Sequence, residues 1–277
     1  MIRQIAGPPP VVQARLLREA DGVVHAFSAR LGGVSRPPFE GLNLGQSVGD
    51  DPTAVLENRR RLFGAFGIDA SRVVRVRQVH GDGVLVVDDG LARRPGFPAC
   101  LVDERVERDA LVTRLPGLAL VVSTADCVPI LIWDPVQRVV AAVHAGWRGT
   151  AKRVAAEAVA VMGAHFGTVP ADCLAAIGPS IRGCCYEVDG PVGEAMGRNI
   201  PGWEAQAIPT RRGHWRLDLA ALNRMVLEAA GLTPERIEVV DLCTACRTDL
   251  FFSHRADHGR TGRMMNFVML TDEDRKA

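Results

Sequence analysis

The sequence has few aromatic residues and almost no excess charge of either sign. Of its 277 residues, 5% are aromatic, one is a tyrosine, and the formal net charge is +1. A dedicated nucleic-acid-binding protein would show a basic stripe, so this balance argues against one. The 47% share of hydrophobic residues argues against intrinsic disorder. A chain of this length buries about three-quarters of its unfolded surface, so it needs no disulfide or structural metal to fold.

Signals for membrane insertion and secretion are also lacking. No apolar run approaches the roughly 20 residues that span a bilayer, and the N-terminal segment has no apolar core of signal-peptide length. The seven cysteines are odd in number and scattered, which fits a reducing compartment better than a disulfide scaffold. We therefore expect a cytoplasmic protein that binds neither membrane nor nucleic acid. The sequence indicates no particular protein partner.

Three signatures of nucleotide and copper chemistry are missing. No Gly-x-x-x-x-Gly-Lys-Ser/Thr run is present, which excludes a phosphate-binding loop of the NTPase type. The zinc nucleobase-deaminase signature, His-x-Glu followed by Pro-Cys-x-x-Cys, is absent as well. The seven histidines form no His-x-His pair, so a multicopper laccase array is not expected.

Strands and helices are predicted to alternate irregularly along the chain. Many apolar runs of strand length follow one another with no helix between them, unlike the regular repetition of a doubly wound sheet. Helix start signals lie at Asp51-Pro52, Thr150 and Asp218, and the second of these predicts a helix over residues 151–166. We predict one α/β domain over residues 1–277, with layered mixed sheets and flanking helices. Residues 1–10, which contain three consecutive prolines, are expected to form a loose leader.

Three apolar strands are each followed by a side chain able to bind a metal. His80, Cys127 and His144 stand at the three strand ends. Imidazole and thiolate are good zinc ligands, and three protein ligands leave a fourth position for water, as in catalytic sites. Zinc lowers the pKa of that water to about 7. The three residues are far apart in sequence and match no short metal motif, so packed side chains without chemistry are the alternative interpretation.

Cys127 and His144 also allow interpretations other than a catalytic zinc site. A thiolate activated by imidazole is the nucleophile of a metal-free cysteine hydrolase or amidase, with Asp126 orienting the base. Two histidines and one cysteine also suit blue copper, but no methionine follows Cys127 before Met162, so copper is disfavoured. A zinc-dependent interaction module, in which a fourth ligand closes the site, is the non-enzymatic alternative.

Two further segments carry the features of anion sites. The turn Gly146–Thr150 contains Arg148 at an expected helix start, where free N–H groups favour negative charge. The run Phe251–Arg263 holds three arginines and two histidines beside an aromatic pair. A simple helix cap and a solvated basic loop are the respective alternatives.

Four cysteines fall in two pairs whose role the sequence does not define. Cys184 and Cys185 are adjacent, and Cys243 and Cys246 form a lone C-x-x-C, which is weak evidence for redox work. The four could in principle build a structural zinc site, but neighbouring cysteines rarely ligate one ion. We therefore expect them to be buried or incidental.

Ten motifs in a fixed order are together more specific than any one of them. They are Ser28–Ser35, Leu42–Gly45, Val48–Asp51, Gln78–Gly81, Asp109–Thr113, Ala125–Pro129, Val143–Thr150, Ile177–Pro179, Cys184–Val188 and Thr261–Arg263. This series resembles the YfiH-type laccase-domain family, whose members are also called polyphenol oxidases and purine nucleoside phosphorylases. The resemblance extends from about residue 27 to residue 270.

The resemblance implies a metal and a fold. In the family, two histidines and a cysteine hold zinc, and the matching motifs here carry His80, Cys127 and His144. The implied fold is a layered α/β arrangement similar to bacterial toxin deamidases, which use a Cys–His pair. The implied reaction is phosphorolysis of adenosine, inosine and 5′-methylthioadenosine to the base and ribose 1-phosphate, with adenosine deaminase activity beside it. The polyphenol oxidase name implies copper instead.

Roles for other residues follow from this reaction as hypotheses. Asp126 would move protons during deamination. Phosphate would be bound by Arg30, Arg148 and Arg255, because guanidinium groups make bidentate contacts with it. Asn43 would hydrogen-bond the base or the sugar. His254 and Ala256 depart from the family pattern, which expects an aromatic residue and a second arginine there, so the substrate preference is open.

Overall fold

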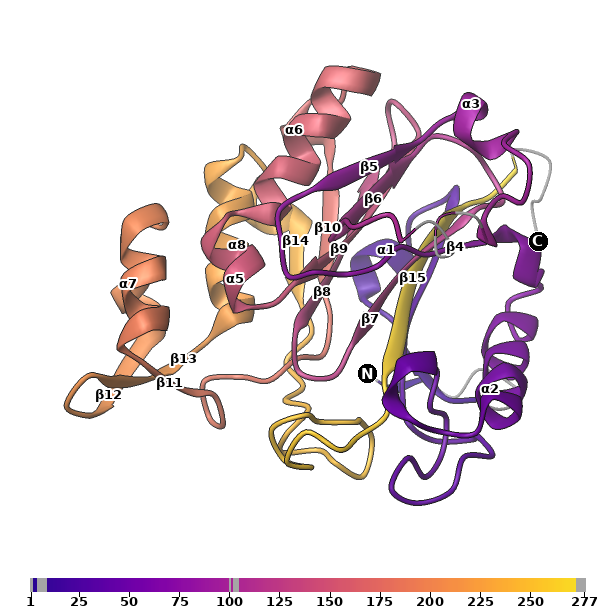
Figure 1. Cartoon of the computed structure of the whole chain (residues 1–277). Coiled ribbons are helices and arrows are strands. Elements are labelled where there is room, and N and C mark those ends of the chain that lie inside the picture. The colour runs from indigo at the N-terminus through magenta and orange to yellow at the C-terminus, as the bar shows by residue number, and fades with distance from the viewer. Residues whose placement is uncertain (1, 4–8, 100, 102–104, 273–277) are drawn as a thin grey trace.

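Two six-stranded sheets packed face to face form the centre of the protein (Figure 1). The computed structural model describes residues 2–3, 9–99, 101 and 105–272. The first sheet has the order β1 (Ile2–Arg3), β2 (Val11–Val12), β3 (Val23–Ser28), β15 (Met264–Leu270), β7 (Ala119–Thr124) and β4 (Val73–Val74). The second has the order β14 (Ile237–Val239), β10 (Leu174–Ile177), β8 (Val128–Asp134), β9 (Val139–Ala145), β6 (Ala110–Thr113) and β5 (Val84–Val87). Both sheets are mixed, because each contains parallel and antiparallel pairs.

Helices cover the two outer faces, which gives four layers in the order helix, sheet, sheet, helix. Helix α2 (Pro52–Gly64) packs on the first sheet, and α6 (Val154–Phe166) and α8 (Leu219–Ala229) pack on the second. Helix α7 (Gly190–Asn199) lies at one end of the molecule beside a small sheet of β11 (Glu187–Asp189), β13 (His214–Leu217) and β12 (Ala207–Arg211) (Figure 1). The shorter helices are α1 (Arg15–Arg18), α3 (Asp89–Ala92) and α5 (Trp147–Ala151).

The central strands are apolar throughout because both of their faces are buried. In β9, Val139, Ala141 and Val143 pack toward the helices, whereas Val140 and Ala142 pack between the two sheets. In β15, alternate residues likewise divide between the space between the sheets and the face under α2. Side chains of a strand point alternately to its two faces, so one unbroken apolar run fills two cores.

The α/β fold with mixed sheets and flanking helices is confirmed, and one local prediction needs correction. The helix predicted over residues 151–166 begins only at Val154 as α6, because a left-handed φ of 60° at Arg153 separates it from the short helix α5. Within the predicted loose leader, Ile2–Arg3 pairs with Val11–Val12 as an edge strand. Residues 1 and 4–8 of that leader lie outside the described residues. In the described part of the chain, no helix combines the length and apolarity needed to cross a membrane.

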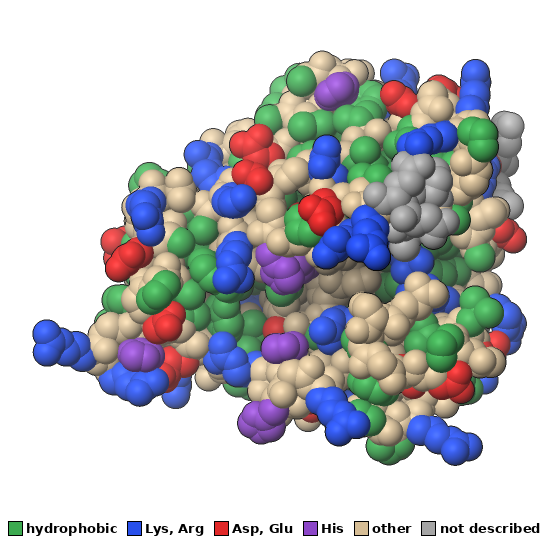
Figure 2. Space-filling view, viewed as in Figure 1, with side chains coloured by type: hydrophobic (Ala, Val, Ile, Leu, Met, Phe, Trp, Pro, Cys, Tyr) green, Lys and Arg blue, Asp and Glu red, His purple; other side chains and the backbone are tan. Residues whose placement is uncertain are grey.

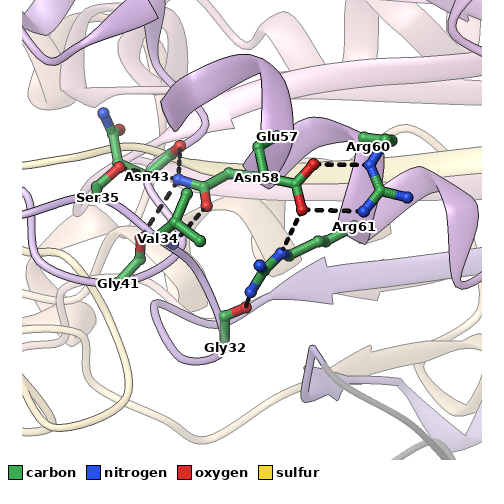
Figure 3. A network of polar contacts seen from close by, with 9 residues as sticks. All are labelled: Gly32, Val34, Ser35, Gly41, Asn43, Glu57, Asn58, Arg60 and Arg61. Carbon is green, nitrogen blue, oxygen red and sulfur yellow. Dashed lines mark hydrogen bonds and ion pairs between the residues drawn. The ribbon is translucent and has the colours of Figure 1, made fainter. Parts of the chain in front are cut away.

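The long loop between β3 and α2 is fixed to the helix by one buried carboxamide (Figure 3). Asn58 of α2 accepts a hydrogen bond from the Val34 N–H and donates to the Ser35 hydroxyl and the Asn43 carbonyl. Buried polar groups must find partners, and this side chain satisfies several groups of the loop at once. The loop is therefore held in a defined conformation against α2.

A buried histidine in β3 makes stability depend on pH. His25 accepts a hydrogen bond from the Ala14 N–H through Nε2, while its Nδ1 has no partner among the described residues. Burial, with a smaller effect of the Arg18 charge, lowers its pKa from 6.5 to about 4. Because the folded-state pKa lies below the unfolded one, the unfolded chain binds this proton more readily. The contribution of His25 to stability is therefore complete above pH 6.5 and is lost as the pH falls toward 4.

Replacing His25 by glutamine should reduce the acid sensitivity of folding. Glutamine retains an acceptor for Ala14 but does not titrate. At 1.36 kcal/mol per pH unit, the wild type should lose about 2 to 3 kcal/mol more than His25→Gln between pH 7 and 4.5. Urea unfolding at the two pH values measures this difference. The exposed His165→Gln variant of α6 should behave as the wild type, and equal losses in all three proteins would contradict the assignment.

Candidate metal centre and its cavity

His80, Cys127 and His144 lie close together at one end of the central strands of the second sheet. Strands β8 and β9 are antiparallel neighbours in which Val128 is paired with Ala145, so Cys127, just before β8, lies beside His144 near the end of β9. The ligand atoms of the three residues all lie within 4.8 Å of one another. The Cys127 Sγ is 3.9 Å from the His80 Nε2, and the two imidazole rings stand edge to face at 4.9 Å. We call these three residues the trio.

A buried carboxylate from the neighbouring strand holds two members of the trio. Asp109, immediately before β6, is fully buried, and its Oδ1 lies 2.8 Å from the His144 Nδ1. The same carboxylate accepts backbone N–H groups of the His80 loop, at 3.0 Å from His80 and 2.6 Å from Gly81. The Nδ1 of His144 is therefore occupied, and its Nε2 remains to face the other two residues. Such a carboxylate–histidine contact fixes ring orientation in metal sites.

Cys127, His144 and Asp109 hold one another in ionised form. Burial raises the pKa of Cys127, but the two neighbouring imidazoles outweigh burial and bring it down to about 6. Burial lowers the pKa of His144, yet the Cys127 thiolate and the Asp109 carboxylate raise it to about 9. Hydrogen bonds from His144 and Gly81 keep the pKa of Asp109 below its usual value despite burial. The arrangement presents a thiolate at neutral pH, which is the form that binds metals and acts as a nucleophile.

The backbone around the trio is strained and tightly packed. His80 and Asp126 adopt left-handed φ angles of 59° and 86°, which non-glycine residues rarely adopt and which cluster at functional sites. Both carboxylate oxygens of Asp126 are occupied: Oδ1 accepts the Thr244 hydroxyl at 2.6 Å and Oδ2 accepts the Arg255 N–H at 2.7 Å. A Cβ atom at Gly146 would lie 2.8 Å from the His80 ring, so only glycine fits there.

A cavity of about 1050 Å³ opens in front of the trio. Figure 2 shows the hollow on this face, with Lys or Arg and His side chains around it. Its walls include the trio, Tyr186, Trp147 and seven arginines, namely Arg59, Arg75, Arg77, Arg105, Arg148, Arg255 and Arg263. Among the described lining residues, Asp126 is the single carboxylate. The cavity is therefore strongly cationic and suited to an anionic ligand.

Three of these arginines are half-buried with no carboxylate partner among the described residues. Arg75 has no hydrogen bond or ion pair there, and Arg59 and Arg263 donate only to backbone carbonyls. Burial and the neighbouring Arg75 lower the pKa of Arg59 to about 9, and burial lowers the pKa values of Arg75 and Arg263. All three remain charged at neutral pH. Crowded, partly desolvated cations of this kind favour a bound anion.

Comparison with known proteins now identifies the family. A family model described as multi-copper polyphenol oxidoreductase laccase matches residues 24–271. The chain belongs to this family. It is 43% identical over 252 residues to a purine nucleoside phosphorylase of Deinococcus radiodurans, covering 90% of this chain and 89% of that protein. It is 39% identical over 250 residues to the purine nucleoside phosphorylase YlmD of Bacillus subtilis, covering 89% and 88%.

Solved structures of relatives share the whole fold. YlmD from Geobacillus stearothermophilus aligns with a TM-score of 0.89 at 36% identity, covering 98% of this chain and 99% of that one. The Bacillus licheniformis protein YfiH aligns with a TM-score of 0.85 at 39% identity, covering 91% and 94%. The resemblance to the YfiH-type laccase-domain family that the motifs suggest is confirmed.

Some of the predicted anion-binding residues of this laccase-domain chain lie at the cavity and others do not. Arg148 and Arg255 line it, and each guanidinium packs on an aromatic ring, that of Trp147 and that of Tyr186. Arg30 instead donates to the carbonyls of Thr248 and Glu40 and does not line the cavity. The turn at Gly146 places α5 beside the trio, but Thr150 lies buried inside that helix and does not cap it.

Asn43 is also absent from the cavity lining. It is fully buried, and its Oδ1 accepts the N–H groups of Gly45 and Arg263. Its Nδ2 donates to the Asp50 carboxylate. The whole carboxamide is therefore used within the protein, where it ties the long loop to the C-terminal segment and brings Arg263 to the cavity wall.

The predicted site residues do not include Asp109 or the arginines at positions 59, 75, 77 and 105, whereas Arg263 belongs to the run Phe251–Arg263 that the sequence indicates as an anion site. For Asp109 a signal exists, because a carboxylate directly before the fully apolar run Ala110–Val112 must be buried with its partners. The arginines carry no such signal. Arg59 comes from α2, Arg75 and Arg77 from the segment after β4, and Arg105 and Arg263 from two further loops, so only the tertiary structure gathers them.

Proposed function

We propose that this protein is a zinc-dependent purine nucleoside phosphorylase, active on adenosine, inosine and 5′-methylthioadenosine. The observation that carries the proposal is a single cavity that combines the trio with a surplus of arginines. The names of the relatives from Deinococcus radiodurans and Bacillus subtilis support the same reaction. Phosphate would enter as a substrate, and the base and ribose 1-phosphate would leave.

The donor set of the trio fits zinc. Two imidazole nitrogens and one thiolate sulfur are typical zinc ligands, and three protein ligands leave the fourth coordination position open. The Cys127 Sγ, the His144 Nε2 and the His80 Nε2 would hold the ion, since Asp109 occupies the other nitrogen of His144. When bound, zinc supplies a Lewis acid and activates water. The cavity lining contains three histidines among the described residues, His80, His144 and His254, which is few for a multicopper array.

The arginines would bind and orient phosphate. A guanidinium offers two parallel N–H donors that match two phosphate oxygens, and Arg75 has its donors free of other described partners. Arg148 and Arg255 are held by their aromatic neighbours at 4.3 and 5.0 Å from the ring centres. The faces of Tyr186 and Trp147 offer apolar surface on which a purine can stack.

We propose that Asp126 positions Cys127 and Arg255 and does not move protons. Its two oxygens accept the Thr244 hydroxyl and the Arg255 N–H, so neither is free to take a substrate proton. The carboxylate fixes the turn that presents Cys127 and the segment that presents Arg255. Adenosine deamination remains part of the proposal, with the activated water directed at the purine C6 position.

A product assay tests this function. Inosine should release hypoxanthine only when phosphate is present, with one ribose 1-phosphate formed for each base. Adenosine without phosphate should yield inosine if the second activity is present. Base release that is independent of phosphate would show a hydrolase, and no release under any condition would overturn the proposal.

A metal-free cysteine hydrolase or amidase is the second candidate, favoured by one observation. Cys127, His144 and Asp109 form a thiolate, an imidazolium and an orienting carboxylate, the arrangement that activates a nucleophilic cysteine. Such an enzyme should keep its activity after exhaustive chelation and lose it to iodoacetamide. A phosphorylase that needs the trio's metal should lose activity to the chelator and regain it with zinc.

Replacing Asp109 by asparagine should weaken metal binding at the trio. Asparagine has the same shape but lacks the charge that orients and polarises His144, and such changes typically cost 10- to 100-fold in metal affinity or activity. Competition with a chromophoric chelator measures the affinity. Asp134, another fully buried carboxylate at the far end of β8, provides the matched control. Asp134→Asn should bind as the wild type does, and an unchanged affinity in Asp109→Asn would contradict the role given to Asp109.

A further inference from the structure

Two turns outside the trio bring four cysteines together. Cys184 and Cys185 lie on the turn before β11, and Cys243 and Cys246 lie on the turn after β14. We propose that these four thiolates bind a second metal ion, a zinc held in a tetrahedral structural site. The expectation that these cysteines are incidental is therefore replaced, because the folded chain gathers all four.

The distances between the sulfur atoms fit one ion. Four sulfurs at about 2.3 Å from a tetrahedral zinc lie roughly 3.8 Å from one another. The Cys246 Sγ is 3.5 Å from that of Cys184 and 3.3 Å from that of Cys185. All four sulfurs lie within 4.8 Å of one another. Adjacent cysteines can share one ion here because the turn directs both sulfurs toward Cys246.

The backbone prepares the site. The Arg182 N–H points at the Cys243 Sγ at 3.4 Å, and the Cys246 N–H faces the same sulfur. Donors of this kind stabilise a thiolate. The two turns are also joined by backbone hydrogen bonds on both sides of Ser180, from its N–H to the Leu242 carbonyl and from the Thr244 N–H to its carbonyl. The ligands are therefore in register before a metal binds, which lowers the cost of binding.

A single soft metal explains the cluster better than a disulfide or an iron–sulfur cluster. A disulfide needs sulfurs about 2.05 Å apart and would use only two of the four. Iron–sulfur clusters distribute their cysteines over several irons, whereas these sulfurs are close enough to share one ion. Four cysteine thiolates in a tetrahedral set are a common structural site for zinc. Cys184 and Cys246 are exposed, so a chelator can reach the ion.

The site would brace two walls of the cavity. Thr244, inside the C-x-x-C turn, donates its hydroxyl to Asp126, the neighbour of Cys127. Tyr186, which follows Cys185 directly, lines the cavity. Loss of the ion should therefore increase hydrogen exchange in residues 182–186 and 243–247. Any effect on nucleoside turnover rests on the proposed function, whereas metal binding by the four cysteines does not.

Metal analysis of purified variants tests the proposal. The Cys127→Ala protein, in which the cluster is untouched, should retain one zinc per chain. The double variant Cys184→Ser/Cys246→Ser should lose the ion bound by the four cysteines. Cys173 is a buried cysteine elsewhere in the fold, so Cys173→Ser should hold as much metal as the wild type. Cobalt-substituted Cys127→Ala should show the d–d bands of tetrahedral thiolate coordination. Removing the ion from Cys127→Ala should lower its Tm.

Several results would overturn the second site. The first is a Cys127→Ala protein that contains no metal, and the second is iron with labile sulfide at the four cysteines. The third is a disulfide after anaerobic purification, which would leave five titratable thiols instead of the seven in the sequence. If the ion is present but inosine is not converted, the second site stands and the proposed phosphorylase activity falls. The two proposals therefore fail in distinguishable ways.

Discussion

Replacing Cys127 by alanine should abolish base release from inosine and remove one metal ion per chain. Its sulfur is the single thiolate of the trio, and without it two imidazoles remain as protein ligands. Metal catalysis stabilises a transition state by several kcal/mol, so kcat/KM should fall at least about a thousandfold, since each 1.36 kcal/mol is a factor of ten. Steady-state kinetics and metal analysis on the same preparation measure both losses.

The matched control is Cys173→Ala. Cys173 is fully buried in the core against the helices and is not among the cavity-lining residues, so this variant should lose some stability but keep its turnover and its metal. If Cys127→Ala loses the trio's metal and still converts inosine, the metal has no part in the reaction. If it keeps the metal and loses turnover, a nucleophilic cysteine accounts better for the site.

Replacing Arg75 by methionine should raise the KM for phosphate by about 10- to 100-fold. This guanidinium lies beside Arg59 in the cavity and has no partner among the described residues. A hydrogen bond to a charged group contributes roughly 1.5–3 kcal/mol, which corresponds to that range at 1.4 kcal/mol per tenfold. Methionine keeps much of the side-chain volume and removes the charge. Initial rates at varied phosphate and saturating inosine measure the effect.

Arg114→Met provides the control for charge alone. Arg114 is exposed and outside the cavity lining, so its loss should leave the KM for phosphate unchanged. The KM for inosine should change much less than that for phosphate in Arg75→Met. An Arg75→Met enzyme with wild-type phosphate dependence would contradict the anion site. A comparable rise in both constants would indicate a general disturbance of the cavity.

The sequence predicts those parts of the fold that depend on burial alone. Unbroken apolar runs such as Val139–Val143 indicate strands with two buried faces, and the sheets at the centre follow. The small sheet of β11, β12 and β13 escaped prediction because its residues are mostly exposed or half-buried. The break between α5 and α6 has no sequence signal, since it depends on a left-handed arginine, Arg153.

The candidate site is only partly predictable for a similar reason. Cys127 directly precedes β8, and His144 lies near the end of its antiparallel neighbour β9, so local topology alone places the two together. His80 reaches them through hydrogen bonds to Asp109, a contact between distant segments. Arg30 and Asn43 are residue types suited to ligand binding, yet backbone groups and the Asp50 carboxylate of the folded chain occupy their polar atoms. Residue type suggests what a side chain can bind, whereas the fold decides whether it is available.

The paired cysteines show the same limit. Adjacent residues usually point apart, which made a shared ion at Cys184 and Cys185 unattractive from sequence. The hydrogen bond from the Cys185 N–H to the Arg182 carbonyl closes a tight turn, and this turn brings both sulfurs to one side. The adjacent pair Cys184-Cys185 in the sequence does not by itself predict the backbone geometry of this turn.

Anomalous diffraction at the zinc edge, on crystals of protein that releases hypoxanthine from inosine, tests the central claim most directly. We expect a peak bonded to the Cys127 Sγ and to the Nε2 atoms of His80 and His144, together with phosphate bound by arginines of the cavity when phosphate is added. Active protein with no metal at these three side chains would contradict it.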